Sequence, residues 1–290
     1  MENRILTVAS SPHIKSSLRV STIMRDVLIA LLLPAAAGVY FNGIEGLYLI
    51  AATIASAVVS ELVFSKIMRR PHTLGDLSAV VTGLVTALVL PLATPLWVAG
   101  ISSLFAIIVV KCLFGGLGQN FMNPAVTGKI FVATAYGRLM TTVPFSSDDA
   151  MTRLLGQAGG NLGEASVAAI IIGGIYLIVR GVIRARIPVT IIVISLLYSA
   201  IVLGDVTVLG LNGSVYLAAF FLATDYASSA TTNEGKLVFA AVVGLLGSLF
   251  IGKSGNAEGI YYAVILGNIF APFIDTFFKG KVDTKKEANA

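Results

Sequence analysis

One segment combines residue types that could hold a cofactor inside a membrane. It runs from Lys111 to Ala125, reads KCLFGGLGQNFMNPA, and lies between two long apolar runs. In hydrocarbon each unpaired backbone amide costs several kcal/mol, so irregular chain at that depth must be buried in protein or line a wet cavity. We therefore expect a cofactor or solute site here, formed by Gly115, Gly116, Gly118, Gln119, Asn120 and Asn123.

Acidic residues form a second set of candidates, because they lie within or at the ends of apolar runs. They are Glu61, Asp76, Asp225 and Asp275. A carboxylate inside a membrane is costly, so its default interpretation is functional or paired. Thr224 and Asp225 precede the hydroxyl-rich run YASSATTNEGK, which suits hydrogen bonds to a phosphate or a flavin ring edge. The alternative is an interfacial loop in which Asp225 caps a helix. Glu61 and Asp275 are expected near an interface.

Two lysines flank the glycine-rich segment. Lys111 and Lys129 could extend to the cytoplasmic surface, which is the favoured interpretation, or neutralise a phosphate or a reduced flavin. The run GSLFIGKS (Gly247 to Ser254) fits the phosphate-loop pattern, but it ends an apolar helix and lacks the preceding strand that the motif needs. We therefore exclude nucleotide hydrolysis at that run.

The composition places these residues in a membrane. Of 290 residues, 56% are hydrophobic and only 12% charged, whereas about 25% would be charged in a soluble domain. The single cysteine excludes a disulfide framework, a four-thiolate zinc site and a self-contained iron–sulfur cluster. With two histidines far apart, no metal site is expected. The net charge of +5 is interpreted as a topology signal and not as a sign of nucleic-acid binding.

The long apolar runs predict an all-α integral membrane protein of about ten transmembrane helices. The third, fifth and eighth runs are short or interrupted by glycine, which is typical of half-helices or re-entrant segments. The ranges are 23–41, 46–65, 75–91, 97–114, 125–140, 165–183, 187–204, 208–224, 235–251 and 259–278.

Lysine and arginine predict the orientation. The first apolar run is interpreted as a retained transmembrane helix and not as a signal peptide. Placing residues 1–22 and 279–290 in the cytoplasm puts most Lys and Arg on that side, as the positive-inside rule requires. Residues 141–164 then form the one sizeable extracytoplasmic loop.

The two halves of the sequence resemble each other. Leu92-Ala93-Thr94 directly follows the third range, Leu222-Ala223-Thr224 ends the eighth, and corresponding ranges recur at offsets of roughly 130 to 145 residues. The ranges predict a five-helix repeat in 23–140 and an inverted second repeat in 165–278. Such repeats usually form a site between the halves. The alternative is that the shared tripeptide is a coincidence in an Ala- and Leu-rich chain.

Several ordered blocks together resemble the NqrB/RnfD family. Its members are the RnfD proteins of Rnf electron-transport complexes and the homologous NqrB proteins of the sodium-pumping NADH:quinone reductase. The most diagnostic blocks are KCLFGGLGQNFMNPA and AFFLATDYASSATTNEGKLVF. The others are SSPH with STIM, LSAVVTGLVTALVLP, GEASVAAIIIGGIYLI with RIPVT, and GNAEGIYYAVILGNIFAPFID.

The resemblance implies a function beyond the residue patterns. It implies a multi-pass component of the prokaryotic inner (plasma) membrane, working with Rnf subunits A, B, C, E and G. That complex passes electrons between reduced ferredoxin and NAD, coupled to Na⁺ or H⁺ movement. It also implies FMN joined covalently to a threonine of the outer loop, a second noncovalent flavin such as riboflavin near the glycine-rich segment, and a urea-transporter-like fold.

The sequence departs from the family at two informative places. The attachment sequence S-x-A-T-P is absent from the outer loop. One alignment places Thr152 at its threonine, with Arg153 in place of proline, and another leaves no attachment threonine. Tyr226 also replaces the usual proline after Ala223-Thr224-Asp225. The rival hypothesis is a small-solute channel or transporter of the urea type on the same scaffold, because fold alone does not choose between the two.

Overall fold

The computed structural model describes residues 19–69, 74–140, 150–156 and 160–278. Within these ranges the chain is helical and has no strand, apart from one isolated bridge between Pro91 and Asn161. The predicted all-α class is therefore confirmed. The predicted tails, except residues 19–22, lie outside the described residues, as do parts 141–149 and 157–159 of the predicted outer loop.

The first helix group, α1 to α5, is built around two interruptions. Gly43, whose φ of +80° suits glycine, separates α1 from α2. Asn123 begins α5, because its side chain accepts hydrogen bonds from the backbone and Pro124 occupies the first helical position. The elements are α1 (Val20–Asn42), α2 (Ile44–Ile67), η1 (Leu74–Asp76), α3 (Ser78–Val89), α4 (Leu96–Phe105), the π-helix η2 (Ala106–Cys112), α5 (Pro124–Tyr136) and η3 (Gly137–Leu139).

The second part of the chain starts with two short elements, α6 (Ala150–Leu155) and η4 (Leu162–Glu164). The side chains of Ser166, Asn212 and Thr232 cap the helices that follow them. These later elements are α7 (Val167–Val179), α8 (Arg186–Tyr198), η5 (Ser199–Leu203), α9 (Thr207–Gly210), α10 (Gly213–Leu217), η6 (Ala218–Leu222), α11 (Asn233–Ser254) and α12 (Gly259–Phe278).

Each of the ten predicted apolar ranges contains a helix. Five helical stretches are long and apolar enough to cross a membrane, namely α1, α2, α8 with η5, α11 and α12. The third and fifth ranges hold helices of only 12 and 13 residues, and the eighth holds the short stretch Gly213–Leu222. The sixth is also short, with 13 residues, because the chain turns after Arg180 at Gly181, which has a φ of +70°. These features are those of an all-helical membrane protein.

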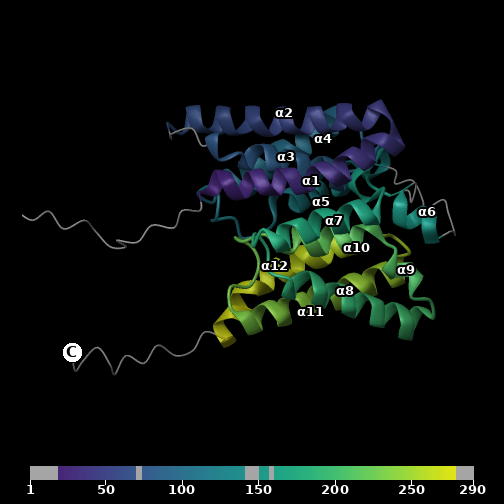
Figure 1. Ribbon diagram of the computed structural model, residues 1–290. Coiled ribbons are helices and arrows are strands. Elements are labelled where there is room, and N and C mark those ends of the chain that lie inside the picture. Colours follow the sequence, from purple (N-terminus) through teal and green to yellow (C-terminus); the bar gives the residue numbers. More distant parts are fainter. Residues whose placement is uncertain (1–18, 70–73, 141–149, 157–159, 279–290) are drawn as a thin grey trace, which may run out of the picture.

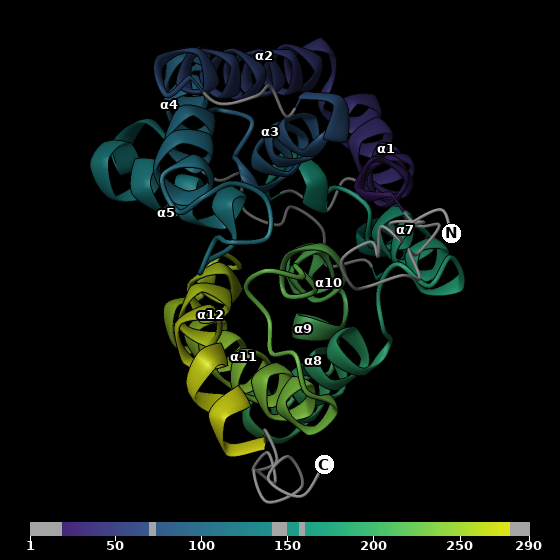
Figure 2. The same ribbon diagram turned by 90° about the vertical axis from the view of Figure 1, so that its left-hand side faces the viewer.

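The helices form two groups, seen end-on in Figure 2. One holds α1 to α5, and the other, the second helix group, holds α8 to α12. Helix α7 packs against α1, and α12 packs against α5, so both contacts join the two parts of the chain. Helix α1 begins and α12 ends at one end of the molecule, whereas α6 lies at the other (Figure 1). We call these the α1-start end and the α6 end.

Candidate functional site

A pocket lies between the two groups at the α1-start end, and we call it the central pocket. Its cavity volume is only about 110 Å³. It is therefore a narrow slot. Most of its wall is apolar, which is usual for sites that bind small organic molecules. Its polar lining residues are Ser78, Thr82, Lys111, Asn120, Asn123, Thr224, Asp225 and Tyr226.

Glycines turn the chain between η2 and α5. Gly115, Gly116 and Gly118 have φ values of +118°, +102° and +86°, which other residues rarely adopt. The backbone N–H of Gly116 donates to the Lys111 carbonyl at 3.0 Å, which closes the turn after the π-helix. The turn leaves Gln119 exposed and the next residue, Asn120, buried.

Asn123 fixes the end of this segment against the second helix group. Its Oδ1 accepts from the backbone N–H of Ala125 at 3.1 Å, which starts α5. Its Nδ2 donates to the Leu222 carbonyl at 3.1 Å, and its own backbone N–H donates to Oδ1 of Asn268 at 3.0 Å. One side chain thus begins a helix and also joins the two groups.

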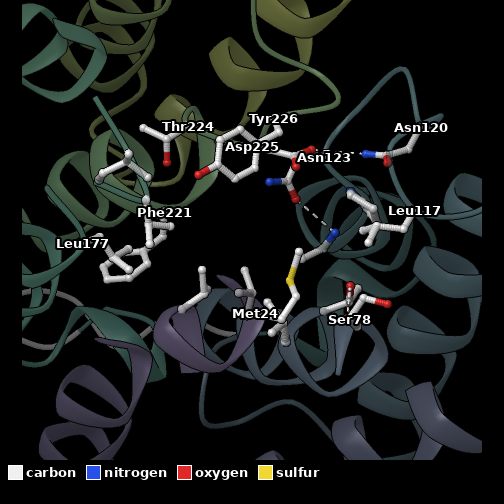
Figure 3. A pocket seen from close by; sticks show the side chains of 18 of the residues that line it. Met24, Ser78, Leu117, Asn120, Asn123, Leu177, Phe221, Thr224, Asp225 and Tyr226 are labelled. Carbon is white, nitrogen blue, oxygen red and sulfur yellow. Dashed lines mark hydrogen bonds between the residues drawn. The ribbon is translucent and has the colours of Figure 1, made fainter. Parts of the chain in front are cut away.

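Asn120 and Asp225 meet across the same boundary (Figure 3). Asn120 Nδ2 donates to Asp225 Oδ2 at 3.1 Å, and Ser228 Oγ donates to the same oxygen at 2.8 Å. Asn268 Nδ2 donates to the Ser228 carbonyl at 3.0 Å. Together with the Asn123–Asn268 bond, these contacts form a chain of hydrogen bonds between the two groups, and Asn120, Asn123 and Asp225 of this chain line the central pocket.

Asp275 of α12 holds the segment that follows Asp225. Its Oδ2 accepts from the backbone N–H of Thr231 at 2.9 Å and from the Thr231 hydroxyl at 2.8 Å. Its Oδ1 accepts from the backbone N–H of Thr232 at 3.2 Å. Asp275 therefore holds Thr231 and Thr232 in place from near the end of α12.

Lys111 forms a buried ion pair at the first-group side of the pocket. Its Nζ lies 2.8 Å from Glu61 Oε2 and donates to Ser78 Oγ at 2.6 Å. The Ser78 hydroxyl in turn donates to Asp76 Oδ1 at 2.5 Å. Lys111 is 3% exposed and Glu61 1% exposed. The favoured prediction that Lys111 extends to the surface is therefore wrong, and Glu61 is not partly solvated as the sequence suggested.

The prediction that Lys129 extends to the surface is also wrong. Its side chain is 1% exposed, and its Nζ lies 2.6 Å from Oε1 of Glu258, at the start of α12. An ammonium with a carboxylate partner has no need to reach the membrane surface, because the partner replaces part of the lost hydration.

The predicted site residues separate into three places. Asn120, Asn123, Thr224 and Asp225 come together at the central pocket. Gly115, Gly118 and Gln119 are exposed and Gly116 is half-buried; all four lie beside the pocket and not among its lining residues. Thr152 lies on α6, at the other end of the molecule (Figure 1).

Sequence reasoning missed two contributors to the site. Met24 of α1 lines the pocket opposite the second helix group, and nothing in its apolar surroundings marked it. Asn268 lies in the middle of α12, where an amide within an apolar run would otherwise lack a partner. That isolated asparagine was a signal that could have been used.

The sequence matches the family described as "NQR2, RnfD, RnfE family" over residues 7–283. The chain belongs to this family. It is 39% identical to the D subunit of the Na⁺-translocating ferredoxin:NAD⁺ oxidoreductase complex of Acetobacterium woodii, over 98% of both chains. It is 34% identical to the D subunit of the proton-translocating ferredoxin:NAD⁺ oxidoreductase complex of Clostridium ljungdahlii, over 96% of both chains. The D subunit of an ion-translocating oxidoreductase complex of Methanosarcina acetivorans is 33% identical over 93% of this chain and 94% of its own.

Proposed function

We propose that this chain is the RnfD component of an Rnf-type complex that transfers electrons between reduced ferredoxin and NAD⁺ and couples the transfer to Na⁺ or H⁺ translocation. The observation that carries the proposal is similarity over nearly the whole length to relatives whose names describe such complexes. The chain would lie in the prokaryotic plasma membrane, with both termini in the cytoplasm, and would assemble with Rnf subunits A, B, C, E and G. Its exposed apolar helix faces supply surface for lipid and for partners.

We place the noncovalent flavin, such as riboflavin, in the central pocket. The residues that line the central pocket fit a flavin. The apolar walls suit its flat ring system, and the Asn120 amide and Asp225 carboxylate suit its polar edge. The slot is narrow, so entry of the ring requires small movements of lining side chains such as Met24 or Tyr226. A bound flavin supplies the electron-transfer chemistry.

The chain's own residues would orient the ring and set its charge environment. Asn120 and Asp225 would face the polar edge, and the exposed backbone of Gly115 to Gly118 would leave room at the rim. Lys111 would add positive charge nearby, already held in place by Glu61 and Ser78. Thr224 would act through its backbone, because its hydroxyl donates to the Phe220 carbonyl at 2.6 Å.

Thr152 is the proposed attachment point for covalent FMN. It lies on a short helix in the predicted outer loop, and its side chain is partly accessible. Residues 23–140 and 165–278 would be inverted repeats of a ten-helix, urea-transporter-like fold. Two matched local structures support the repeat. Asp76 accepts from the backbone N–H of Ser78 at the start of α3, and Asn212 accepts from that of Ser214 at the start of α10.

A pair of buried contacts supports the same repeat. In the first half Lys111, at the end of the fourth helix, bonds to Glu61 of the second. In the second half Ser248 of α11 donates to Ser195 of α8 at 3.0 Å. Each contact thus joins the second and fourth helices of its half.

Fluorescence of the denatured chain tests the covalent flavin. The whole complex is dissolved in SDS, separated on a gel and viewed under ultraviolet light. The wild-type band of this chain should fluoresce, and Thr152→Ala should abolish the signal, whereas Thr142→Ala in the same predicted loop should keep it. A wild-type band without fluorescence would exclude covalently attached FMN. Copurification of the chain with the other Rnf proteins tests the assembly, and a chain that purifies alone and colourless would favour the solute channel.

A further inference from the structure

A second cluster of buried ionisable groups lies away from the central pocket, toward the α6 end. The Tyr261 hydroxyl donates to Oε1 of Glu164, which also accepts from Asn161 Nδ2 at 2.7 Å. Lys129 Nζ lies 4.3 Å from the centre of the Tyr261 ring and 2.6 Å from Glu258 Oε1. Three elements, η4, α5 and α12, thus bring two acids, one ammonium and one phenol together.

The charges of this cluster do not balance when both acids are ionised. Among the described residues Lys129 is the one cation that forms an ion pair within this cluster, and it pairs with Glu258, so one negative charge, on Glu164, remains uncompensated. Glu164 is 0% exposed and Lys129 1% exposed. The penalty for burying an unpaired ion is several kcal/mol even after relaxation. Binding one proton removes this penalty.

One member of the cluster has a path to the outside. Glu258 lines an open pocket of about 650 Å³ beside α11 and α12, together with Lys253, Asn256 and Tyr262. Glu164 does not line this pocket, and within the cluster it is linked to Glu258 through Tyr261 and Lys129. Protons can therefore enter at Glu258, and the ring face of Tyr261 offers the ammonium a cation–π surface between the two acids.

We propose that Glu164, Tyr261, Lys129 and Glu258 form a proton-binding site that exchanges one proton with the pocket at Glu258. On uptake, a hydronium ion in the pocket gives its proton to a Glu258 oxygen, and one O–H bond forms as another breaks. The Lys129 ammonium then moves from Glu258 toward Glu164 and keeps its own three protons. The cluster charge changes from −1 to zero, and release reverses each step.

The surroundings of Glu164 contain few other ionisable groups. Gly38 of α1, Leu88 of α3 and Gly213 of α10 are the close neighbours of η4, and none carries a charge. Tyr216 of α10 donates its hydroxyl to the Gly210 carbonyl. Lys253 and Tyr262 face the pocket side of Glu258.

The ligand is a proton and not a metal cation. Glu164 accepts from one O–H donor and from two N–H donors, the Asn161 backbone at 3.2 Å and its Nδ2. Hard cations require a shell of oxygen ligands, and hydrogen-bond donors directed at the carboxylate occupy the places where such a cation would bind. This inference rests on the buried charges and is independent of the flavin and of complex assembly.

Infrared titration of the full-length protein in lipid tests the site without any electron transfer. The wild type should show a carboxylic-acid C=O band that persists above the pH range in which exposed carboxyls ionise. Glu164→Gln and Glu258→Gln should each remove or shift this band. Glu45→Gln is the control, because Glu45 is an exposed acid at the start of α2, at the same α6 end.

A milder variant keeps the test decisive if the glutamine variants do not fold. Tyr261→Phe keeps the ring beneath Lys129 and removes only the hydroxyl bond to Glu164, so the titration midpoint of the band should shift. A wild type without the band, or a band unaffected by all three cluster variants, would overturn the proposal. A band that disappears on adding Na⁺ at constant pH would instead indicate a cation site and would equally overturn it.

Discussion

Asn120 and Asp225 are joined by a 3.1 Å hydrogen bond, although they come from the first and second helix groups. Asn120 follows the glycine turn after η2, and Asp225 follows η6. Close by, the Leu222 carbonyl at the end of η6 accepts a hydrogen bond from Asn123 Nδ2, and an unpaired backbone group there would be costly in a membrane. The side-chain contact between Asn120 and Asp225 adds a second link between the two groups and lies among the polar lining residues of the central pocket.

Removing the charge at Asp225 should impair coupling. Asp225→Asn keeps the size of the side chain but replaces an acceptor of two hydrogen bonds with an amide. We expect ion-dependent electron transfer to fall at least several-fold while the complex still assembles. Ion uptake by vesicles containing the complex measures this. Asp205→Asn is the control, because Asp205 is an exposed acid before α9. Normal coupling in Asp225→Asn would contradict a role of Asp225 in ion coupling.

Asn120 should be needed to retain the noncovalent flavin. Asn120→Ala removes the amide that joins the pocket to Asp225, so we expect a lower content of extractable flavin per chain. A hydrogen bond to a charged group contributes about 1.5–3 kcal/mol, which corresponds to a loss of affinity of roughly ten-fold or more. Gln119→Ala changes the exposed neighbour and should keep the wild-type content. Equal flavin contents in the two variants would place the flavin elsewhere.

Breaking the Lys111–Glu61 pair should destabilise the protein more than removing it altogether. Lys111→Met removes the ammonium that lies 2.8 Å from the buried Glu61 carboxylate, and breaking a buried ion pair in this way costs about 3–5 kcal/mol. The double variant Lys111→Met with Glu61→Gln should recover much of the loss. Thermal unfolding in detergent measures both. Lys66→Met, at an exposed lysine of α2, should leave the unfolding midpoint unchanged. A single variant as stable as the wild type would contradict this prediction.

Asn123→Ala should lower the unfolding midpoint through two losses. The cap of α5 contributes about 1 kcal/mol, and the bond to the Leu222 carbonyl adds a link between the helix groups. Asn256→Ala is the matched control, because Asn256 accepts a backbone hydrogen bond from Glu258 in an exposed turn. The two variants should differ clearly in midpoint. Similar midpoints would show that the interhelical bond contributes little.

Patterns within the sequence predicted the class and the helices well. The charged fraction and the long apolar runs predicted an all-helical membrane protein, and each of the ten ranges contains a helix. The glycines and amides of Lys111 to Ala125 predicted the break between η2 and α5. These features are local, because hydropathy, glycine conformation and helix capping depend on residues near one another in the chain.

The partners of the buried charges were decided only by the tertiary structure. Lys111 was expected to reach the surface, but it pairs with Glu61, and Lys129 pairs with Glu258. The hydrogen bond between Asn120 and Asp225 likewise joins residues far apart in sequence. Thr152 lies at the opposite end of the molecule. The sequence by itself determined that these polar groups lie within apolar runs and need partners. Which partner each one finds depends on how the helices pack, because the energy of a buried ion or amide is set by atoms a few ångströms away in space.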